Sequence, residues 1–305
     1  MIIVRGLVAS LLIGAAFIRP VQAAETLKIA SFSTVLTEIS QRVGGTHVTV
    51  AGLVRPGQDP HEYQPTPADL EQAADAKLIL LSGKHLEHYL DKIQQATGGK
   101  AESLAVGDAL PTLKMKADPD ESQGKEAADP NGMIDDPHWW NSVANMERAT
   151  VIVRDTLIKL DQADRIDYEE NTKTYLAKLD ALNNWAKRKV AELSRDKRKL
   201  VTSHDAFQYL ARDYGFKIYA IEGVSTETEP SDRHVAELID DIKKQQVKAI
   251  FLENTLNPKV TREITRESGA KIGGSLYADG LGDGAGSTYE GLVRHNISTI
   301  VDALK

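Results

Sequence analysis

A chain of 305 residues, 41% of them hydrophobic and 27% charged, suits a globular protein of two lobes better than one small core. Its net charge of −7 argues against a nucleic-acid-binding protein, which needs a basic face to neutralise phosphate. Because there is no cysteine, disulfide scaffolds, iron–sulfur clusters and thiol nucleophiles are excluded, and metal or acid–base chemistry depends on the eight histidines.

The first 23 residues have the pattern of a secretory signal peptide. Arg5 is followed by an apolar run from Gly6 to Ile18, and small residues around Ala23 suit a signal peptidase. The run is shorter than the ~20 residues of a membrane span, although an N-terminal anchor is the alternative. Since no cysteine follows, we expect no lipid anchor and a mature periplasmic protein that begins near Ala24.

Short apolar runs alternate with helical patterns after the signal. Strands are predicted at 27–31, 48–54 and 78–81, and helices at 35–43, 67–76 and 85–97. Thr66 and Pro67 form a helix start, because threonine caps the helix and the first helical position needs no N–H. This alternation predicts βαβ units and a mostly parallel sheet.

The middle of the chain changes character. Residues 115–135 are rich in Asp, Glu, Gly, Pro and Lys, which predicts a mobile loop. Helical character resumes at 141–160. Residues 164–193 then carry one apolar stripe at helical spacing, which predicts a long helix that runs past both lobes.

The second half repeats the alternation. Strands are expected at 200–203, 216–221, 247–252 and 272–277, and helices at 205–214, 231–245, 258–268 and 287–304. The predicted fold class is therefore α/β, with two βα lobes of mostly parallel sheet bridged by one long rigid helix. The expected boundaries are 1–23 for the signal peptide, 24–160 for the first lobe, 161–194 for the linking helix and 195–305 for the second lobe.

Three histidines and one aspartate are candidates for a site in the interlobe cleft. His61 and His138 each end an Asp-Pro-His sequence, in which proline stiffens the turn. His204 and Asp279 stand at the ends of predicted strands, where ligands of open α/β sheets bind. Spacing alone leaves open whether these four residues converge.

Blocks around these residues resemble the cluster A-I metal-binding proteins of ABC importers, and the zinc proteins of the ZnuA type are similar. The blocks occur in the family's order, at 57–67, 136–140, 202–207, 229–231, 276–282 and 287–289. The resemblance implies two lobes on a rigid helix and one metal ion bound by His61, His138, His204 and Asp279. It also implies high-affinity capture in the periplasm and delivery to a membrane permease, with a periplasmic zinc chaperone as a further candidate partner and the protein as a monomer.

The residue at the third ligand position, His204, helps to predict which metal is bound. Manganese members typically carry a carboxylate there, whereas this chain has His204, and three imidazoles with one carboxylate suit Zn²⁺ better than Mn²⁺. Many zinc members also have a histidine-rich loop between the first two ligands. Residues 115–135 are instead acidic and contain no histidine, so metal gathering by such a loop is in doubt.

Two alternatives to a zinc carrier are compatible with these residues. An exported zinc-dependent hydrolase would keep one coordination position open for water and use Glu62 or Asp205 as general base. A carrier of another divalent metal, such as Mn or Fe, would use the same residues. Four protein ligands favour a carrier that is not an enzyme. His85 and His88 suggest a solvated helix face, and we expect surface or packing roles for His47, His234 and His295.

Overall fold

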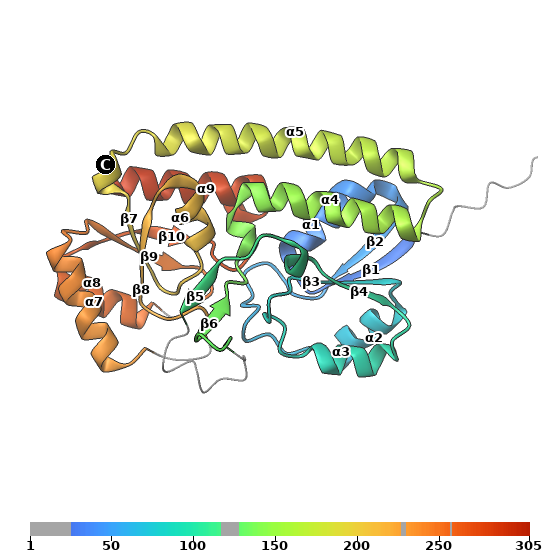
Figure 1. Cartoon of the computed structure of the whole chain (residues 1–305), viewed down its shortest axis with the longest axis horizontal. Helices are drawn as coiled ribbons and strands as arrows, with labels where there is room; N and C mark the ends of the chain where they lie inside the picture. Colours follow the sequence, from blue (N-terminus) through green and yellow to red (C-terminus); the bar gives the residue numbers. More distant parts are fainter. Residues whose placement is uncertain (1–25, 117–127, 227–229, 257) are drawn as a thin grey trace, which may run out of the picture.

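The computed structural model describes residues 26–116, 128–226, 230–256 and 258–305. The predicted signal peptide therefore lies outside the described residues. Figure 1 shows two α/β lobes side by side beneath one long helix, which agrees with the predicted fold class. No helix in the described ranges has the length and apolar character needed to cross a membrane.

The first lobe is built on a four-stranded parallel sheet in the order β2-β1-β3-β4. Its strands are β1 (Leu27–Ser31), β2 (Val48–Gly52), β3 (Leu78–Leu81) and β4 (Glu102–Ala105). Its helices are α1 (Thr34–Gly44), α2 (Pro67–Asp75) and α3 (Leu90–Thr97). Strand β4 was not predicted, because this short edge strand contains Glu102 and Ser103 and lacks a fully buried position.

The second lobe repeats this plan, with a parallel sheet in the order β10-β9-β7-β8. Its strands are β7 (Lys199–Thr202), β8 (Lys217–Ala220), β9 (Ala249–Glu253) and β10 (Lys271–Leu276). Its helices are α6 (Gln208–Tyr214), α7 (Asp232–Lys244), α8 (Lys259–Ser268) and α9 (Tyr289–Leu304). The 3₁₀ helices in the described ranges are η1 (Gly45–His47), η2 (Val106–Ala109), η3 (Trp139–Asn141), η4 (Arg195–Lys197) and η5 (Gly284–Gly286).

Helix α4 (Val143–Leu160) leads into the predicted long helix, α5 (Arg165–Val190), which has 26 residues. At 1.5 Å per residue α5 is about 39 Å long. Its buried stripe includes Tyr175, Leu182 and Val190, and it packs against α1 in the first lobe and α9 in the second. Figure 1 shows α5 along the upper edge of both lobes, so the prediction of a shared helix is confirmed.

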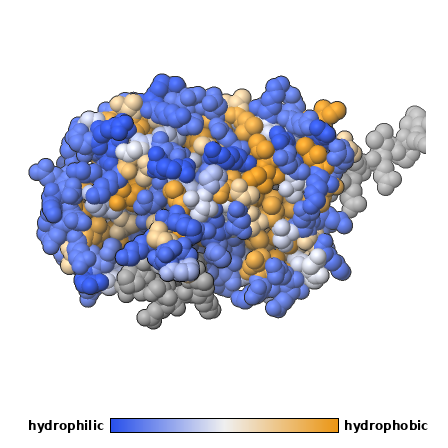
Figure 2. All heavy atoms as spheres, in the orientation of Figure 1, coloured by the Kyte–Doolittle hydropathy of each residue, from blue (hydrophilic) through white to orange (hydrophobic). Residues whose placement is uncertain are grey.

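The lobes also share one hydrophobic core. A single cluster of buried side chains extends from Leu36 in α1 through Met146 in α4 and Leu182 in α5 to Ile300 in α9. Figure 2 shows hydrophilic side chains over most of one face, with apolar side chains gathered among them. Because apolar side chains of both lobes pack into the same cluster, separating the lobes as rigid bodies would expose apolar surface to water.

Three sequence predictions need correction. The segment 115–135 was expected to be a mobile loop, but its two ends pair as antiparallel strands β5 (Lys114–Lys116) and β6 (Met133–Asp135). The carboxylate of Asp129 accepts the N–H groups of Asn131 and Met133 and shapes the turn into β6. Residues 117–127 lie outside the described residues.

Two helices also begin later than predicted. Helix α3 starts at Leu90 rather than His85, because Lys84 and His85 have φ of 54° and 64°, which an α-helix cannot accommodate. Helix α6 starts at Gln208 rather than Asp205, whose N–H donates to the carbonyl of Gly223 instead. The predicted start of α2 is confirmed: Thr66 and Asp69 form a reciprocal capping box, with proline at the first helical position.

Candidate metal site

Both Asp-Pro-His turns are built in the same way. Oδ1 of Asp59 accepts the backbone N–H of His61 at 2.8 Å, and Oδ1 of Asp136 accepts that of His138 at 2.9 Å. The aspartate thus closes a local turn around the proline, and the histidine at its end is held on a fixed backbone. This is the stiff turn that the sequence predicted, with the aspartate as the residue that closes it.

The ring of His138 has a second support. Its Nδ1 lies 2.9 Å from Oδ1 of Asp136, so the aspartate orients the imidazole and leaves Nε2 free to face the lobe interface. Asp136 and His138 are both fully buried. Asp136 therefore orients the ring of His138, whereas Asp59 holds only the backbone of His61.

His204 follows the carboxyl end of β7 and is held by the neighbouring strand β9. Oε1 of Glu253 accepts the backbone N–H groups of Ser203 and His204 at 2.9 and 3.1 Å, while Oε2 contacts Nδ1 of His204. A single carboxylate thereby fixes both the backbone and the ring of His204. The ring is directed so that its Nε2 faces the first lobe.

Asp279 follows the carboxyl end of β10, and its two oxygens have different surroundings. Oδ2 accepts the hydroxyl hydrogen of Thr255 at 3.0 Å. Oδ1 is buried and accepts no hydrogen bond from the described residues. A buried carboxylate oxygen without a donor is costly unless a cation faces it, so this atom is directed at the place where a cation would bind.

The four predicted residues converge on one point between the lobes. Nε2 of His138 lies 3.1 Å from Nε2 of His61 and 3.3 Å from Nε2 of His204. Oδ1 of Asp279 lies 3.1, 3.5 and 3.7 Å from Nε2 of His204, His138 and His61. These four ligand atoms all lie within 4.8 Å of one another, and all four residues are buried.

The spacing of these atoms fits a small ion with four ligands. A regular tetrahedron with metal–ligand distances of about 2.0–2.1 Å has edges of about 3.3–3.4 Å. Five of the six separations, at 3.1–3.7 Å, scatter around that value, and all six are within 4.8 Å. The arrangement therefore accommodates a tetrahedral cation at its centre without a large movement of the side chains.

Burial and the central carboxylate set the protonation of the cluster. Burial lowers the pKa of His61, whose contact with Asp279 does not compensate for it. Burial also disfavours the charged form of His204, but Asp279 and Glu253 outweigh it and raise the pKa of His204 well above its ordinary value. In the same way, the hydrogen bond with Asp136 and the nearby carboxylate of Asp279 raise the pKa of His138 against the effect of burial.

The pKa of Asp279 is shifted in the opposite direction, below its ordinary value. Burial alone would raise its pKa, but the charge of His204 and the contacts with His138 and His61 hold the pKa of Asp279 well below its ordinary value. Without a bound cation, protons on the imidazoles therefore balance the buried carboxylate. A divalent cation would replace those protons and interact with the same anionic oxygen.

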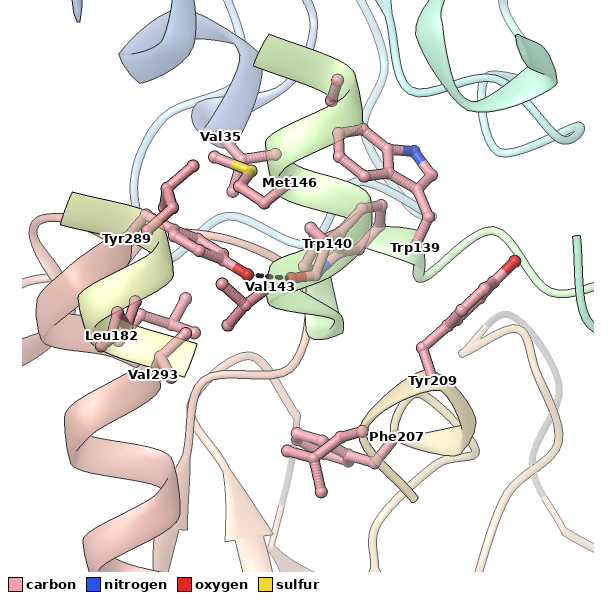
Figure 3. Packing of buried hydrophobic residues seen from close by; sticks show 14 of the residues in the cluster. Val35, Trp139, Trp140, Val143, Met146, Leu182, Phe207, Tyr209, Tyr289 and Val293 are labelled. Atoms are coloured by element: carbon pink, nitrogen blue, oxygen red, sulfur yellow. Dashed lines mark hydrogen bonds between the residues drawn. The ribbon is translucent and has the colours of Figure 1, made fainter. Parts of the chain in front are cut away.

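Aromatic and amide side chains beside the site join the two lobes. Nε1 of Trp140 donates to the carbonyl of Ala278 at 2.8 Å, next to Asp279, and Nδ2 of Asn141 donates to the carbonyls of Ala206 and Ala278. The hydroxyl of Tyr289 donates to the carbonyl of Trp140, as Figure 3 shows within the shared core. These bonds hold the His138 loop against the loops that carry His204 and Asp279.

The other candidate residues lie apart from this cluster. His85 and His88 are exposed on turns before α3, not on the helix face that was expected. Glu62 is exposed, and Asp205, whose pKa burial raises to about 7, accepts hydrogen bonds from Gln208. Neither belongs to the group of converging ligand atoms among the described residues.

The remaining histidines have structural contacts. The two ring nitrogens of His47 each lie 2.8 Å from a carboxylate oxygen, one of Asp164 and one of Asp167, at the start of α5. His234 contacts the carbonyl of Ala220, and His295 contacts that of Ser275. These contacts are consistent with the surface or packing roles expected for them.

The sequence reasoning missed two residues that support the cluster, Glu253 and Thr255. A glutamate at the end of the apolar run 249–252 was a usable signal, since an acidic residue that ends a buried strand needs a partner.

The structure has two α/β lobes, each with a parallel sheet, on one long helix, and a buried cluster of potential metal-ligand side chains between the lobes. These features define a metal-binding solute-binding protein of the ABC-transporter class. The family model described as ZnuA, zinc-uptake complex component A, periplasmic, matches residues 29–303. The chain belongs to this family, whose members are solute-binding transport proteins rather than enzymes.

The names of similar proteins refer to different metals. The manganese-binding lipoprotein MntA from Bacillus subtilis is 33% identical over 288 residues, covering 92% of this chain and 90% of the relative. The iron-binding protein YfeA from Yersinia pestis is 30% identical, covering 92% of this chain and 87% of the relative. The structure of the periplasmic zinc-binding protein TroA from Treponema pallidum matches with a TM-score of 0.81 and 31% identity, covering 92% of this chain and 99% of TroA.

Proposed function

We propose that this protein captures Zn²⁺ in the periplasm through His61, His138, His204 and Asp279 and delivers it to the permease of an ABC importer. The observation that carries this proposal is the convergence of three Nε2 atoms and one unpaired carboxylate oxygen at separations that suit a tetrahedral ion. Because all four ligands come from the protein, the ion has no open position for a catalytic water.

Zinc is proposed over manganese and iron because of the donor set. Three imidazoles and one carboxylate oxygen are nitrogen-rich, whereas Mn²⁺ prefers oxygen donors and more of them. The names of the relatives do not decide the metal, since they include manganese, iron and zinc binders. The ligand chemistry of this chain is therefore the argument for zinc.

We further propose that residues 1–23 are a cleaved leader and that the mature protein works as a monomer without a lipid anchor. No cysteine is present to carry a lipid, whereas the name of the relative MntA calls it a lipoprotein. The proposed organisation is a first lobe at 24–160, a linking helix at 161–194 and a second lobe at 195–305. Helix α5 lies within that linking segment and packs on helices of both lobes.

The test is metal analysis of protein purified from the exported fraction without added metal, followed by competition binding. We expect one equivalent of zinc, tighter binding of Zn²⁺ than of Mn²⁺, and a melting temperature that rises with zinc because the ion binds only the native state. His138→Ala should abolish the rise, whereas His85→Ala, an exposed histidine, should leave it unchanged. Preferential binding of manganese or iron by the wild-type protein would refute the assignment to zinc.

Turnover of an ester, peptide or phosphate substrate by the zinc form, with loss on His61→Ala, would refute the carrier role itself. Asp279→Ala should weaken zinc binding less than His138→Ala, because a water molecule can replace a carboxylate oxygen more readily than a buried imidazole. Equal losses in the two variants would contradict that ranking.

A further inference from the structure

Thr255 separates the roles of the two oxygens of Asp279. Its Oγ1 donates to Oδ2 at 3.0 Å, whereas Oδ1 faces the three Nε2 atoms. A carboxylate can bind a cation through one oxygen or through both. With Oδ2 engaged by a hydroxyl, Asp279 presents a single oxygen to the site.

The rings of His138 and His204 are restricted in the same way. Nδ1 of His138 is engaged by Asp136 and Nδ1 of His204 by Glu253, so each ring offers only Nε2. Glu253 itself uses Oε1 for two backbone N–H groups and Oε2 for His204. Within the described part of the chain, the converging ligand atoms are therefore three nitrogens and one oxygen.

The number of donors discriminates between metals. Zn²⁺ is stable with four ligands in a tetrahedron, whereas Mn²⁺ prefers octahedral coordination by oxygen donors. A second oxygen from Asp279 would raise the number of protein donors to five and add oxygen character. Whatever prevents Oδ2 from turning towards the ion therefore favours zinc.

Thr255 is placed for this role by the strand that holds His204. Glu253 ends β9, and Thr255 follows it by two residues. Because β9 lies between β7 and β10 in the sheet, its carboxyl end lies between the loops of His204 and Asp279. One strand end thus supports both metal ligands of the second lobe, through Glu253 on one side and Thr255 on the other.

We propose that Thr255 is a specificity-determining residue, which holds Asp279 to one-oxygen coordination and so favours Zn²⁺ over Mn²⁺. The proposal rests on the function proposed above and deepens it. Thr255 does not bind the ion; it acts through Asp279 as a positioning residue. Its removal should therefore change the relative affinity for the two metals, not only the strength of binding.

The experiment compares Thr255→Val, which keeps the shape and removes the hydroxyl, with Thr255→Ser, which keeps the hydroxyl. Zn²⁺ and Mn²⁺ affinities are measured by chelator competition at one pH. We expect the valine variant to lose about tenfold in the ratio of zinc to manganese affinity, the scale found for residues that orient metal ligands. The serine variant should keep the wild-type ratio.

A spectroscopic measurement reports the coordination number independently. Co²⁺ absorbs strongly in the visible range in four-coordinate sites and weakly in five- or six-coordinate sites. We expect strong absorption for the wild type and Thr255→Ser, and weaker absorption for Thr255→Val. If the valine variant does not fold, Thr255→Ala is measured in its place against the same serine control.

The outcomes separate this inference from the proposed function. If the variant without the hydroxyl loses affinity for both metals by the same factor, or keeps the tetrahedral Co²⁺ spectrum, Thr255 is only a structural support and the inference is wrong. Wild-type protein that still prefers zinc in that case leaves the proposed function intact. Wild-type protein that prefers manganese refutes both.

Discussion

The carboxylate of Asp59 connects the turn that carries His61 to the second lobe. Its Oδ1 accepts the backbone N–H of His61 at 2.8 Å, while its Oδ2 accepts the hydroxyl hydrogen of Thr226 at 2.9 Å. The loops of His138, His204 and Asp279 are instead held together by several buried bonds from Trp140, Asn141 and their neighbours. The N–H of Gly57, in the segment before His61, also donates to the carbonyl of Leu281 in the second lobe. Because none of the bonds from Trp140 and Asn141 involves the turn of His61, we expect this turn to open first when zinc leaves.

Thr226→Val should speed the release of zinc. The substitution removes one hydrogen bond to a partly buried carboxylate, worth about 1 kcal/mol, so we expect the release rate to rise about fivefold. The measurement is stopped-flow transfer of zinc to an excess of chelator. Thr226→Ser, which keeps the donor, should release zinc at the wild-type rate. Equal release rates for Thr226→Val and the wild type would show that the bond between Thr226 and Asp59 does not slow the release of zinc.

Zinc binding should release protons near neutral pH. The pKa of His204 is raised well above its ordinary value and that of His138 is raised, so the metal-free site carries protons that a bound ion must displace. His61, whose pKa burial lowers, is already neutral. We expect about one to two protons per ion at pH 7, and an affinity that falls as the pH falls further.

Calorimetry in buffers of different ionisation enthalpy measures this number directly. The slope of the binding enthalpy against the buffer's ionisation enthalpy gives the protons released. It should shrink at high pH, where His204 and His138 lose their protons before the metal arrives. A slope of zero at pH 7 would show that the metal-free imidazoles are neutral and would contradict this account.

Much of the site could be predicted from the sequence because its ligands lie in locally determined structures. The two Asp-Pro-His turns need only neighbouring residues, and His204 and Asp279 follow apolar runs that end as strands. Their convergence required the order of strands in each sheet, which local patterns do not reveal. The family resemblance supplied that step.

Glu253 and Thr255 were missed for the same physical reason. Both act on residues that are distant in sequence, and they reach them only because β9 lies between β7 and β10. The late start of α3 has a different cause. Lys84 and His85 adopt positive φ, although both residues are compatible with a helix, because buried Lys84 bonds to the segment that contains Asp108 and Leu110.

Glu253→Gln should weaken zinc binding by about 10- to 100-fold, the range for groups that orient metal-bound histidine. The amide keeps one acceptor oxygen but offers N–H where His204 or its backbone already donates. Chelator competition measures the loss. Glu62→Gln changes an exposed carboxylate beside His61 and should have no effect. Wild-type affinity in Glu253→Gln would show that the ring of His204 needs no carboxylate partner.

Glu87 should make the stability of the metal-free protein depend on pH. Burial raises its pKa to about 7 from an ordinary value of 4.5, although the N–H groups of Ser82 and Gly83 donate to it. The native state therefore binds this proton more tightly than the unfolded chain does. The resulting stability is fully present below pH 4.5 and is lost as the pH rises through about 7.

The loss should be on the order of 3 kcal/mol, given that each unit of pKa shift corresponds to about 1.4 kcal/mol. The measurement is the difference in free energy of unfolding between wild type and Glu87→Gln, with chelator present, from pH 4.5 to 8. The wild type should lose stability relative to the variant as the pH rises, because only the wild type must ionise a buried group. Glu71→Gln, at an exposed position of α2, should show a constant difference. A constant difference for Glu87→Gln as well would mean that the buried carboxyl group titrates no differently in the folded and unfolded chains.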